Sequence, residues 1–472
     1  MALPPATSQS ERAASWGDAV ENKIIVIDDD PTGSQTVHGC LLLTRWDVDT
    51  LAEGLQDASP LFFVLSNTRG MDAEKAAEVT REICINLRAA IGRLAAQGRA
   101  IQPILVSRSD STLRGHYPVE TDVIADTLGP FDAHFLVPAF FEGGRVTRGS
   151  VHYLLVDGKP VPVHETEFAR DSVFGYRHSF LPDYVEEKTA GRIKAGEVER
   201  FLLSDVRGDC LPRLLALKDN VCCVVDAETR EDLDHFAAQL KAAATQGKRF
   251  LFRSGASLLT ALAALPPQPV AAEDMATFVR DGRPGAVIVG SHVMKTTAQL
   301  GELLKQPGIA PLQIDVSLLP EGRARIVEEA VAAAAAMHDQ GLTPVIYTSR
   351  VERRFADRQQ RLAFGEEVSG TLMDIVRQLP QTLGFLISKG GITSNDVLSD
   401  GLALRASRVL GQIHAGCSVV KCPHDHPRHP DLPVVIFPGN VGDEAGLATV
   451  YRRLAGAGRQ ALRSGSARQV RA

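Results

Sequence analysis

Three consecutive carboxylates follow the first strongly apolar run of the chain, in the stretch IIVIDDDPTGSQ. Asp28, Asp29 and Asp30 would repel one another at the end of a strand unless cations or hydrogen-bond donors lie close by. Such a group can hold substrate hydroxyls, act as a general base or bind a metal ion. A turn that caps the next element also favours Asp, Pro, Thr and Gly, but it needs only one of these carboxylates. The cluster therefore indicates a functional site.

Cationic and hydroxyl side chains follow the next two apolar runs, in the stretches LFFVLSNTRG and ILVSRSDSTLRGH. The guanidinium of arginine is a planar fork that matches a carboxylate or a phosphate. Aspartate accepts hydrogen bonds from hydroxyl groups, and serine can donate or accept them. Ion pairs among solvated loop residues are the competing interpretation. The combination predicts a binding site for a small polyhydroxy acid. The residues are Arg69, Arg108, Asp110, Ser111 and Arg114.

Glycine-rich turns follow three apolar runs in the second half of the chain, in GAVIVGSH, FLISKGGITSND and VVIFPGNVGDE. Glycine lets backbone N–H groups approach phosphate oxygens, and a following helix adds its positive N-terminal dipole. None of the three turns matches GxxxxGK[ST] or GxGxxG. Single glycine turns are common in any fold, but a set of three favours the phosphates of a nucleotide. The residues expected to bind it are Ser291, Gly390, Gly391, Thr393, Ser394, Gly439, Asn440 and Gly442.

One segment, CPHDHPRHP, carries four residues that can ligate zinc: Cys422, His424, His426 and His429. Their alternation with proline is more typical of a surface loop before the last strand. The sequence therefore assigns no metal site.

The elements that must position these residues are short apolar runs that alternate with helical patterns. Such an alternation predicts a mostly parallel α/β sheet whose strands are buried on both faces. Ligands of these sheets bind beyond the carboxyl ends of the strands, where the polar and glycine-rich stretches occur. The predicted strands are 23–28, 61–66, 101–107, 134–139, 220–228, 250–257, 285–291, 311–317, 343–349, 384–391, 417–422 and 433–439. The predicted helices are 72–97, 295–305, 321–340, 366–379, 395–414 and 441–454.

Two segments interrupt this pattern. Residues 145–215 are expected to form long ordered loops with short helices, and the Pro- and Ala-rich stretch 262–275 is expected to separate two domains. We therefore predict two α/β domains, each a mostly parallel sheet flanked by helices, with a ligand site in the cleft between them. The predicted limits are 1–22 for a flexible N-terminal tail, 23–265 for an acid-sugar-binding domain, 266–282 for a linker, 283–457 for a nucleotide-binding domain and 458–472 for a C-terminal tail.

Composition excludes several classes of protein. A chain of 472 residues is too long for one ordinary core. With 51 basic and 57 acidic residues, the net charge of −6 provides no basic face for nucleic acid. No apolar run is long enough to span a bilayer, and the N-terminus lacks the pattern of a secretory signal. Seven scattered cysteines favour reduced thiols. We expect a cytoplasmic protein without nucleic-acid or membrane partners, and homo-oligomer formation is left open.

From about residue 23 to residue 457, the motifs together resemble the four-carbon acid sugar kinase family. The resemblance lies in Asp-Asp-x-Thr-Gly at 29–33, Asp-Ser-Thr-Leu-Arg-Gly at 110–115, Gly-Arg-Val-Thr at 144–147, Gly-Ser at 290–291, Gly-Gly-x-Thr-Ser at 390–394 and the closing PGNVGDE. It implies an enzyme that uses ATP to phosphorylate a tetronate such as threonate, erythronate or 3-oxo-tetronate. The N-terminal domain would hold the acid and the C-terminal domain the nucleotide.

Three positions depart from the pattern of many members of this family. Asp28 is an extra acid where alanine is usual, Pro31 replaces an aromatic residue, and Arg108 stands in place of lysine. Because these positions belong to the expected substrate site, the resemblance implies a divergent branch whose acid can differ from the tetronates.

The resemblance also implies roles for the polar residues. The carboxylate of the acid would be held by Arg69, Arg108 or Arg114, and its hydroxyls by the aspartates. Either Asp29 or Asp30 would accept the proton of the terminal hydroxyl as that oxygen attacks the γ-phosphorus. Mg²⁺ on the phosphates and backbone N–H groups would stabilise the transferred group, and domain closure would exclude water.

Two other functions are open. A phosphatase of the haloacid-dehalogenase type would form a phospho-aspartate at Asp28, but it does not account for the three glycine turns. A non-catalytic protein that binds a sugar acid, or a regulator, would share the acid site without turnover. Replacement of Asp28 by Asn tests the first alternative, and a nucleotide titration tests the second.

Overall fold

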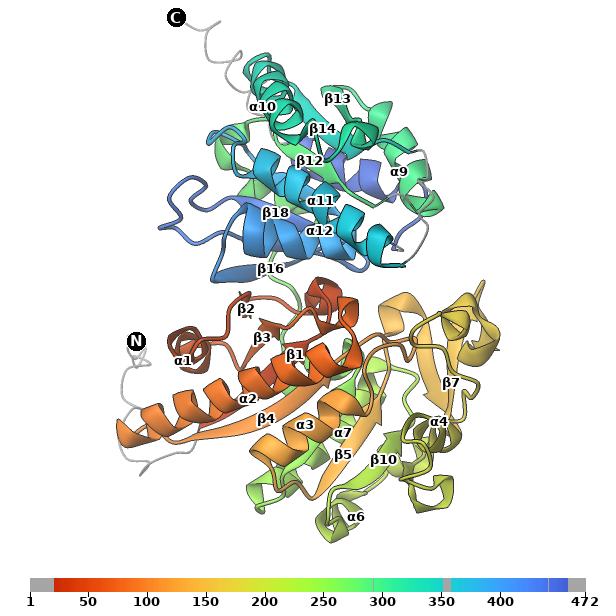
Figure 1. The fold of residues 1–472 in the computed structure, drawn as a ribbon. Helices are drawn as coiled ribbons and strands as arrows, with labels where there is room; N and C mark the ends of the chain where they lie inside the picture. Colours follow the sequence, from red (N-terminus) through yellow and green to blue (C-terminus); the bar gives the residue numbers. More distant parts are fainter. Residues whose placement is uncertain (1–20, 292, 351–357, 440, 457–472) are drawn as a thin grey trace, which may run out of the picture.

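The computed structural model describes residues 21–291, 293–350, 358–439 and 441–456. Fifteen of its strands form one twisted sheet that passes through both halves of the chain (Figure 1). The sheet is buried by helices on both faces, as its continuous apolar strands require. No helix of these residues is long and apolar enough to cross a bilayer.

The N-terminal half of the sheet is entirely parallel. Its strands lie in the order β2 (Leu41–Leu43), β3 (Leu61–Leu65), β1 (Glu21–Asp28), β4 (Ile101–Arg108), β11 (Phe250–Ser254), β5 (Ala133–Val137), β10 (Val221–Val225) and β9 (Glu199–Phe201). Because β1 begins at Glu21, the last two residues of the predicted N-terminal tail belong to a strand.

The C-terminal half is parallel over its first five strands and antiparallel over its last two. The order is β13 (Ile309–Ile314), β14 (Thr343–Thr348), β12 (Ala286–Val289), β15 (Leu386–Lys389), β18 (Pro433–Phe437), β17 (Cys417–Lys421) and β16 (Ala406–His414).

Helices cover both faces of each half. One face of the N-terminal half packs against α1 (Val48–Gln56), α2 (Ala73–Ala96) and α3 (Val119–Leu128). The other face packs against α5 (Leu203–Val206), α6 (Leu211–Ala216), α7 (Arg230–Thr245) and α8 (Ser257–Ala263). In the C-terminal half, α10 (Arg323–Asp339) and α11 (Arg358–Val376) lie on one face, and α9 (Met294–Leu304) and a helix over 446–456 lie on the other.

The longest helix shows why these segments fold as they do. The side chain of Asp72 accepts a hydrogen bond from the backbone N–H of Lys75 at 2.8 Å and so caps the start of α2. Val79, Ile83 and Leu87 recur on one face and are buried against the sheet. The structure confirms the helix predicted over 72–97.

A short antiparallel pairing joins the two halves. The N–H of Gly39 donates to the carbonyl of Val409 at 2.7 Å, the N–H of Val409 donates to Cys40 at 2.8 Å, and that of Thr44 donates to Arg405 at 3.0 Å. These bonds align β2 with β16. The halves therefore share one sheet.

The prediction of a helix over 395–414 was wrong for most of its length. A short helix, α12 (Gly391–Asp396), and a π-helical turn (Val397–Gly401) end before β16 begins. In β16 every second residue is buried, including Val409 and Ile413, which is the two-residue period of a strand. The same alternation is visible in SRVLGQIH, within the range that the sequence analysis assigns to a helix.

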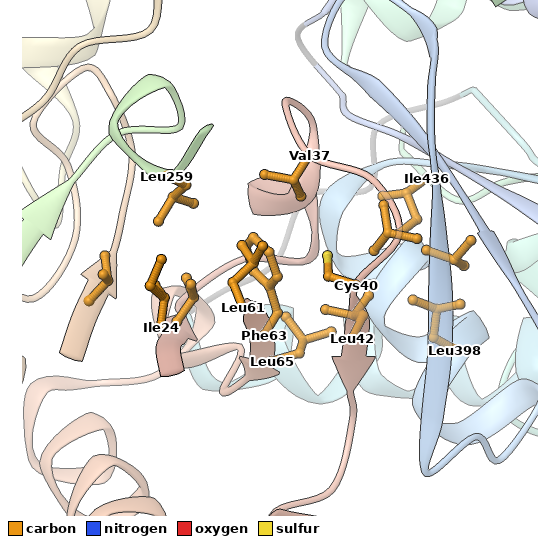
Figure 2. Packing of buried hydrophobic residues seen from close by; sticks show 14 of the residues in the cluster. Ile24, Val37, Cys40, Leu42, Leu61, Phe63, Leu65, Leu259, Leu398 and Ile436 are labelled. Carbon is orange, nitrogen blue, oxygen red and sulfur yellow. The ribbon is translucent and has the colours of Figure 1, made fainter. Parts of the chain in front are cut away.

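One hydrophobic cluster also contains residues of both halves of the chain, on either side of the β2–β16 pairing (Figure 2). Val37, Cys40 and Leu42 of the N-terminal half belong to the same cluster of buried residues as Leu398 and Ile436 of the C-terminal half. The predicted pair of α/β units is confirmed, but the units are fused through sheet and core rather than linked by a tether alone.

Sheet twist decides where the two carboxyl edges lie. Three antiparallel pairings, from β2 through β16 and β17 to β18, give the parallel blocks opposite directions. Neighbouring strands rotate by ~20–25°, so the six steps from β1 to β15 add roughly 120–150°. Register shifts in the β16–β17 pair, on either side of Gly411, increase the local twist. The rotation turns the carboxyl ends of β1 and β15 towards the same side.

The segment 145–215 contains more regular structure than the sequence predicts. A separate antiparallel sheet is formed by β6 (Arg145–Arg148), β7 (Val151–Val156) and β8 (Lys159–Pro162), and α4 (Leu181–Lys188) follows it. The turns use Gly149 and Ser150, then Asp157 and Gly158, all with positive φ, which is the geometry of two-residue hairpins. These Gly-Ser and Asp-Gly pairs were the available signal for the hairpins.

Candidate active site

Asp30 lies between the end of β1 and a single 3₁₀ turn, Pro31–Ser34. Its Oδ1 accepts hydrogen bonds from the backbone N–H of Thr32 at 2.9 Å and from the Thr32 hydroxyl at 2.5 Å. Its Oδ2 lies 3.6 Å from Nη1 of Arg69, and one fifth of the side chain is exposed. Burial acts to raise the pKa of Asp30, but Arg69 and the Thr32 bonds outweigh it and hold the pKa below its ordinary value. Asp30 is thus an ionised, accessible carboxylate.

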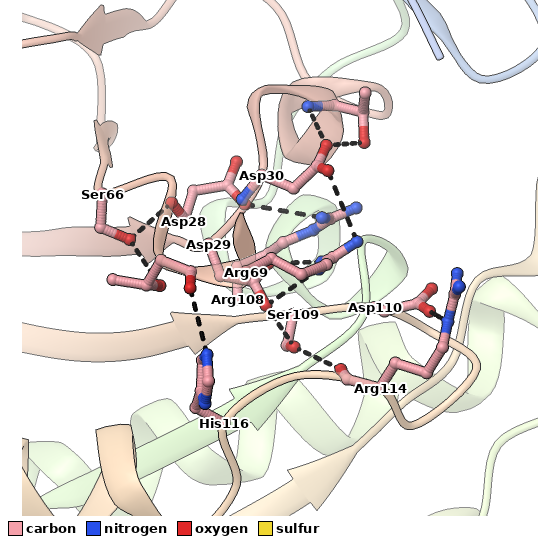
Figure 3. A network of polar contacts seen from close by, with 12 residues as sticks. Asp28, Asp29, Asp30, Ser66, Arg69, Arg108, Ser109, Asp110, Arg114 and His116 are labelled. Carbon is pink, nitrogen blue, oxygen red and sulfur yellow. Dashed lines mark hydrogen bonds and ion pairs between the residues drawn. The ribbon is translucent and has the colours of Figure 1, made fainter. Parts of the chain in front are cut away.

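Asp29 is held from both sides and faces inward (Figure 3). Arg69 donates to Oδ1 from Nη2 at 2.5 Å and to Oδ2 from Nε at 3.3 Å, while the hydroxyl of Ser109 donates to Oδ2 at 2.7 Å. Only 1% of Asp29 is exposed. Because both oxygens are engaged, Asp29 orients Arg69 rather than offering a free carboxylate.

Asp28 and Arg108, two departures from the family pattern, face each other behind the site. Asp28 Oδ1 lies 3.5 Å from Arg108 Nη1, and the two side chains are 0% and 3% exposed. Burial raises the pKa of Asp28 to about 8, although Arg108 opposes the shift. Oδ2 has no hydrogen-bond partner and packs against the backbone of Gly33. A carboxylate enclosed in this way is poorly placed to form the phospho-aspartate of the phosphatase alternative.

Gln35 connects this pair to the other half of the molecule. With its amide oriented to satisfy both atoms, it accepts from Nη2 of Arg108 at 3.1 Å and donates to the carbonyl of Gly416 at 3.3 Å. Arg108 therefore points towards the β16–β17 turn and not towards the substrate side.

A buried ion pair that the sequence analysis missed supports the floor of the site. Nη1 of Arg253 pairs with Glu120, and the two side chains are 4% and 2% exposed. The same guanidinium donates to Ser107 at 2.6 Å and to Ser109 at 2.7 Å. The available signal was a charged residue at the end of an apolar strand, in FLFRS.

Gly115 closes the Asp-Ser-Thr-Leu-Arg-Gly loop over this floor. Its φ is +119°, and a Cβ there would lie 2.4 Å from Ser109 Oγ, 2.7 Å from Arg253 Nη2 and 2.9 Å from Asp29 Oδ2. Only glycine combines this backbone conformation with such a close approach.

Three side chains of the segment 145–215 donate hydrogen bonds to three consecutive carbonyls of the same loop. Nε2 of His152 donates to Ser111 at 2.7 Å, the hydroxyl of Tyr176 to Thr112 at 2.7 Å, and the hydroxyl of Tyr184 to Leu113 at 2.8 Å. Burial lowers the pKa of His152 to about 4, so the ring is neutral and Nδ1 can accept from Thr147. These bonds explain how Leu113 is held at a φ of +67°.

Asp110 and Arg114 border a small recess at the carboxyl ends of β4, β5 and β11. Nε of Arg114 donates to Asp110 Oδ2 at 2.6 Å, and Nη1 lies 3.6 Å from Asp171. Burial acts to raise the pKa of Asp110, but Arg114 and Arg69 hold it well below its usual range. The lining residues are Ser109, Asp110, Leu113, Arg114, Leu136, Pro138, Tyr184, Arg253 and Ser254.

In the C-terminal half, the predicted glycine turns come together around Ser291. A Cβ on Gly390, whose φ is +119°, would lie 3.2 Å from the Cβ of Ser291, and one on Gly439 would lie 3.8 Å from its Oγ. The Thr393 hydroxyl occupies the space beside Gly290, 2.4 Å from where a Cβ would stand. Backbone groups of three loops thus meet at one place.

Three of the predicted nucleotide residues differ from the rest. Ser394 is fully buried and its hydroxyl lies 2.8 Å from that of Ser388, so it ties α12 to β15. Gly442 lies beside Gln299 and His414 rather than beside Ser291. Asn440 lies outside the described residues.

Two cations beside these loops were missed by the sequence analysis. Lys389 is buried, donates to the carbonyls of Pro438 at 2.5 Å and Gly439 at 3.3 Å, and lies over the ring of Phe437. Burial lowers its pKa to about 7. Nη1 of Arg350 donates to the carbonyl of Ser291 at 2.5 Å. Both side chains donate hydrogen bonds to loop carbonyls and so help to fix the shape of these loops.

The two sites meet at Asp30. A Cβ on Gly391 would lie 3.1 Å from Asp30 Oδ2, so the acidic turn after β1 abuts the glycine turn after β15. The hydroxyls of Ser34 and Ser418 lie 3.1 Å apart, and Gln412 donates to the carbonyl of Gln35 at 2.7 Å. The sheet twist has therefore brought the acid side and the glycine side together.

The described residues contain no group of three His, Cys, Asp or Glu side chains that could hold a metal ion. In the histidine-rich segment, His424 pairs with Asp431 and His426 lies 2.8 Å from the carbonyl of Leu402. The segment is a loop before β18, as its composition predicts.

Each half of the chain matches a known domain family. A sugar-binding N-terminal domain matches residues 24–262, and a nucleotide-binding C-terminal domain matches residues 286–447. The first match alone covers half of the chain. The chain belongs to the four-carbon acid sugar kinase family.

Individual relatives agree with this family. A D-erythronate kinase of Heliobacterium modesticaldum (strain ATCC 51547 / Ice1) is 26% identical over 408 residues, which are 83% of this chain and 81% of that protein. A Haemophilus influenzae protein from a domain family of unknown function is 18% identical, with a TM-score of 0.61 over 91% of this chain and all of that one. A candidate tRNA synthase of Salmonella typhimurium LT2 is 21% identical, with a TM-score of 0.66 over 91% and 98%. The two structures establish likeness of fold alone.

This kinase therefore combines a sugar-binding half with a nucleotide-binding half. It is a phosphotransferase whose acceptor is an alcohol group of a sugar acid. The non-catalytic alternative is set aside on the same grounds.

Proposed function

We propose that the enzyme transfers the γ-phosphoryl group of ATP to the terminal hydroxyl of a four-carbon sugar acid. The observation that supports this most directly is the approach of Asp30 to Gly391, because it joins an ionised carboxylate to a glycine turn suited to phosphates. The D-erythronate kinase relative supports the four-carbon length.

In this proposal, Asp30 is the catalytic carboxylate. The terminal hydroxyl donates its hydrogen bond to Oδ2 of Asp30 while its oxygen attacks the γ-phosphorus. The bond from phosphorus to the ADP oxygen breaks, and the hydroxyl proton passes to Asp30 and then to solvent. Phosphoryl transfer depends mostly on position and charge neutralisation, so a weakly basic carboxylate suffices. Arg69 fixes Asp30, and Asp29 fixes Arg69.

The remaining hydroxyls of the acid would lie along Asp110 and Ser111 beside the recess. Arg114 and Arg69 are partly neutralised by their aspartates, and Arg108 is enclosed, so these arginines would position the carboxylates more than bind the acid directly.

ATP would be bound by Ser291, Gly390, Gly391, Thr393 and Gly439, and the roles predicted for Asn440 and Gly442 stay predictions. Since the described residues contain no group of three metal-ligating side chains, Mg²⁺ would arrive with ATP and be held mainly by phosphate oxygens and water. When bound, Mg²⁺ neutralises charge on the phosphates.

We also propose the domain limits 23–265 and 283–457, the first extended to 21 because β1 begins at Glu21, with a linker over 266–282 and a cytoplasmic location. Limited proteolysis followed by mass spectrometry tests the limits, since between residues 21 and 457 the cut is expected within 266–282.

The test of function is ADP release from ATP with a panel of four- to six-carbon sugar acids. We expect turnover with a four-carbon acid and none with the corresponding polyol, with phosphate on the terminal oxygen by NMR. ATP binding without ADP release for every acid would contradict the proposal. Phosphate on an inner hydroxyl would contradict the predicted position.

A further inference from the structure

Among the arginines that border the acid site, those predicted to hold the substrate carboxylate already have carboxylate partners. Arg69 lies against Asp29, Arg108 against Asp28, and Arg114 against Asp110. A guanidinium that is committed to an internal carboxylate has fewer donors and less net charge to offer a second one. The anionic end of the substrate therefore needs another cation.

Arg145 is such a cation. It begins β6, and within the described part of the chain no carboxylate oxygen lies within 4 Å of its guanidinium. Nη1 donates to the carbonyl of Gly143 at 2.5 Å, the guanidinium lies 5.7 Å from the ring centroid of Phe140, and Nε is buried without a partner. A buried donor without a partner is costly, and a ligand carboxylate would relieve it.

The backbone fixes Arg145 at the edge of the recess. Arg145 and Phe140 exchange two backbone hydrogen bonds, of 2.8 and 3.0 Å, directly after β5, whose carboxyl end supplies Leu136 and Pro138 to the recess. Burial lowers the pKa of Arg145; of the charged groups around it, Asp110 and Glu167 act to raise this pKa and Arg114 acts to lower it. Asp110 and Arg114 line the recess.

The absence of a side chain at Gly143 leaves room for the guanidinium of Arg145. A Cβ at residue 143 would lie 2.2 Å from Nη1 of Arg145 and 2.5 Å from the Phe140 ring. Any larger residue would displace the arginine without removing its charge.

We propose that Arg145 binds the carboxylate of the sugar acid and thereby sets the direction in which the acid lies. This rests on the proposed function. The phosphorylated end lies at Asp30 against Gly391, and the carboxylate end lies beyond Asp110 at Arg145. The enzyme then selects acids over polyols through a guanidinium that forms no ion pair with a carboxylate of the described residues.

The test measures binding and turnover separately, for Arg145→Gln and for a control, Arg148→Gln. Arg148 lies on the same strand, is 65% exposed and pairs with Glu228 at the surface. Calorimetry without nucleotide gives the Kd of D-erythronate, D-threonate and their L isomers, and of the matching carboxamides. We expect Arg145→Gln to raise the Kd of the best-bound acid about 30-fold or more, and to leave that of its carboxamide unchanged.

Two further variants separate charge from shape. Arg145→Lys keeps the charge without the fork and should restore part of the affinity, and Gly143→Ala should weaken acid binding while Arg145 is retained. Circular dichroism confirms that each variant is folded.

The assignment is overturned if Arg145→Gln binds the acid as well as Arg148→Gln does, if it weakens acid and carboxamide equally, or if the wild type binds none of the four acids. Acid binding by the wild type without ADP release would contradict the proposed function alone, and the effect of Arg145→Gln on that binding would still decide the assignment.

Discussion

Two edges of the sheet, each formed by carboxyl ends of strands, meet at Asp30, and they differ in the groups that line them. On the sugar side, charged side chains converge and pair with one another, from Arg69 with Asp29 to Arg253 with Glu120. On the nucleotide side, glycine turns dominate, and the cations Lys389 and Arg350 hold backbone carbonyls. Paired, buried charges are costly to assemble but fix geometry, which suits recognition of one acid. Backbone N–H groups recognise phosphates of any nucleotide.

This contrast predicts that the sugar side fails through lost side-chain chemistry and the nucleotide side through altered backbone shape. Four substitutions test the contrast.

Asp30→Asn should have the largest effect. Removal of the ionised acceptor should lower kcat by about 100- to 10,000-fold, while the Kd of ATP stays unchanged, because the nucleotide side is intact. Steady-state ADP release and calorimetry measure the two quantities. If kcat stays within about tenfold of the wild type, Asp30 is not the proton acceptor.

Arg253→Met should strongly destabilise the fold. It leaves Glu120, which is 2% exposed, without its cation, so the free energy of unfolding should fall by about 3–5 kcal/mol. Denaturant titration measures this loss. The control is Arg325→Met, which breaks a pair between side chains that are 65% and 66% exposed and should cost at most about 1 kcal/mol. Equal losses in the two variants would contradict the role of the buried pair.

Gly390→Ala should affect the nucleotide side alone. A non-glycine residue at a φ of +119° costs about 1–3 kcal/mol, and displacement of the turn should raise the Kd of ATP roughly 5- to 100-fold without weakening acid binding. Gly92→Ala, in α2 with open space around it, is the control and should be neutral or slightly stabilising. Weakened acid binding in Gly390→Ala would show that the two sides are not independent.

Asp28→Asn should change turnover least, because Asp28 lies behind the site. Burial holds its pKa at about 8 instead of the ordinary 3.8, so between these values the unfolded chain releases a proton that the folded chain keeps. Wild-type stability should therefore fall through this group as pH rises from about 4 to about 8, and the variant should lack that slope. Thermal unfolding across this range measures the difference. A loss of about 3 kcal/mol or more at pH 7 in the variant would instead mean that Asp28 is ionised against Arg108.

Most residues of the candidate site could be placed at strand ends from the sequence, because the signals for them are local. The strands ending at Asp28, Arg108 and Lys389 each contain a short apolar run, and polar or glycine-rich turns follow these strands directly. The chemistry of each turn is therefore visible in a few adjacent letters.

The missed features depend on contacts between distant segments. Arg253 and Lys389 lie in runs that look like ordinary strands. Their partners, Glu120 and the carbonyl of Pro438, belong to segments that are distant in the sequence, so the ion pair and the hydrogen bond are visible only in the structure. Likewise, nothing near Asp28 or Arg108 shows that these two departures from the family pattern face each other. β2 is three residues long, which is too short for any periodic pattern.

That three-residue strand makes the enzyme one folding unit. If the chain were divided between the two binding halves, β2 and β16 would each become an open sheet edge, and the apolar cluster of Val37, Leu42 and Leu398 would be exposed to water. Such edges pair with any available strand. Separated halves should therefore associate with each other or aggregate. An exchange of nucleotide domains between relatives consequently needs a matched pair of edge strands as well as matched active-site loops.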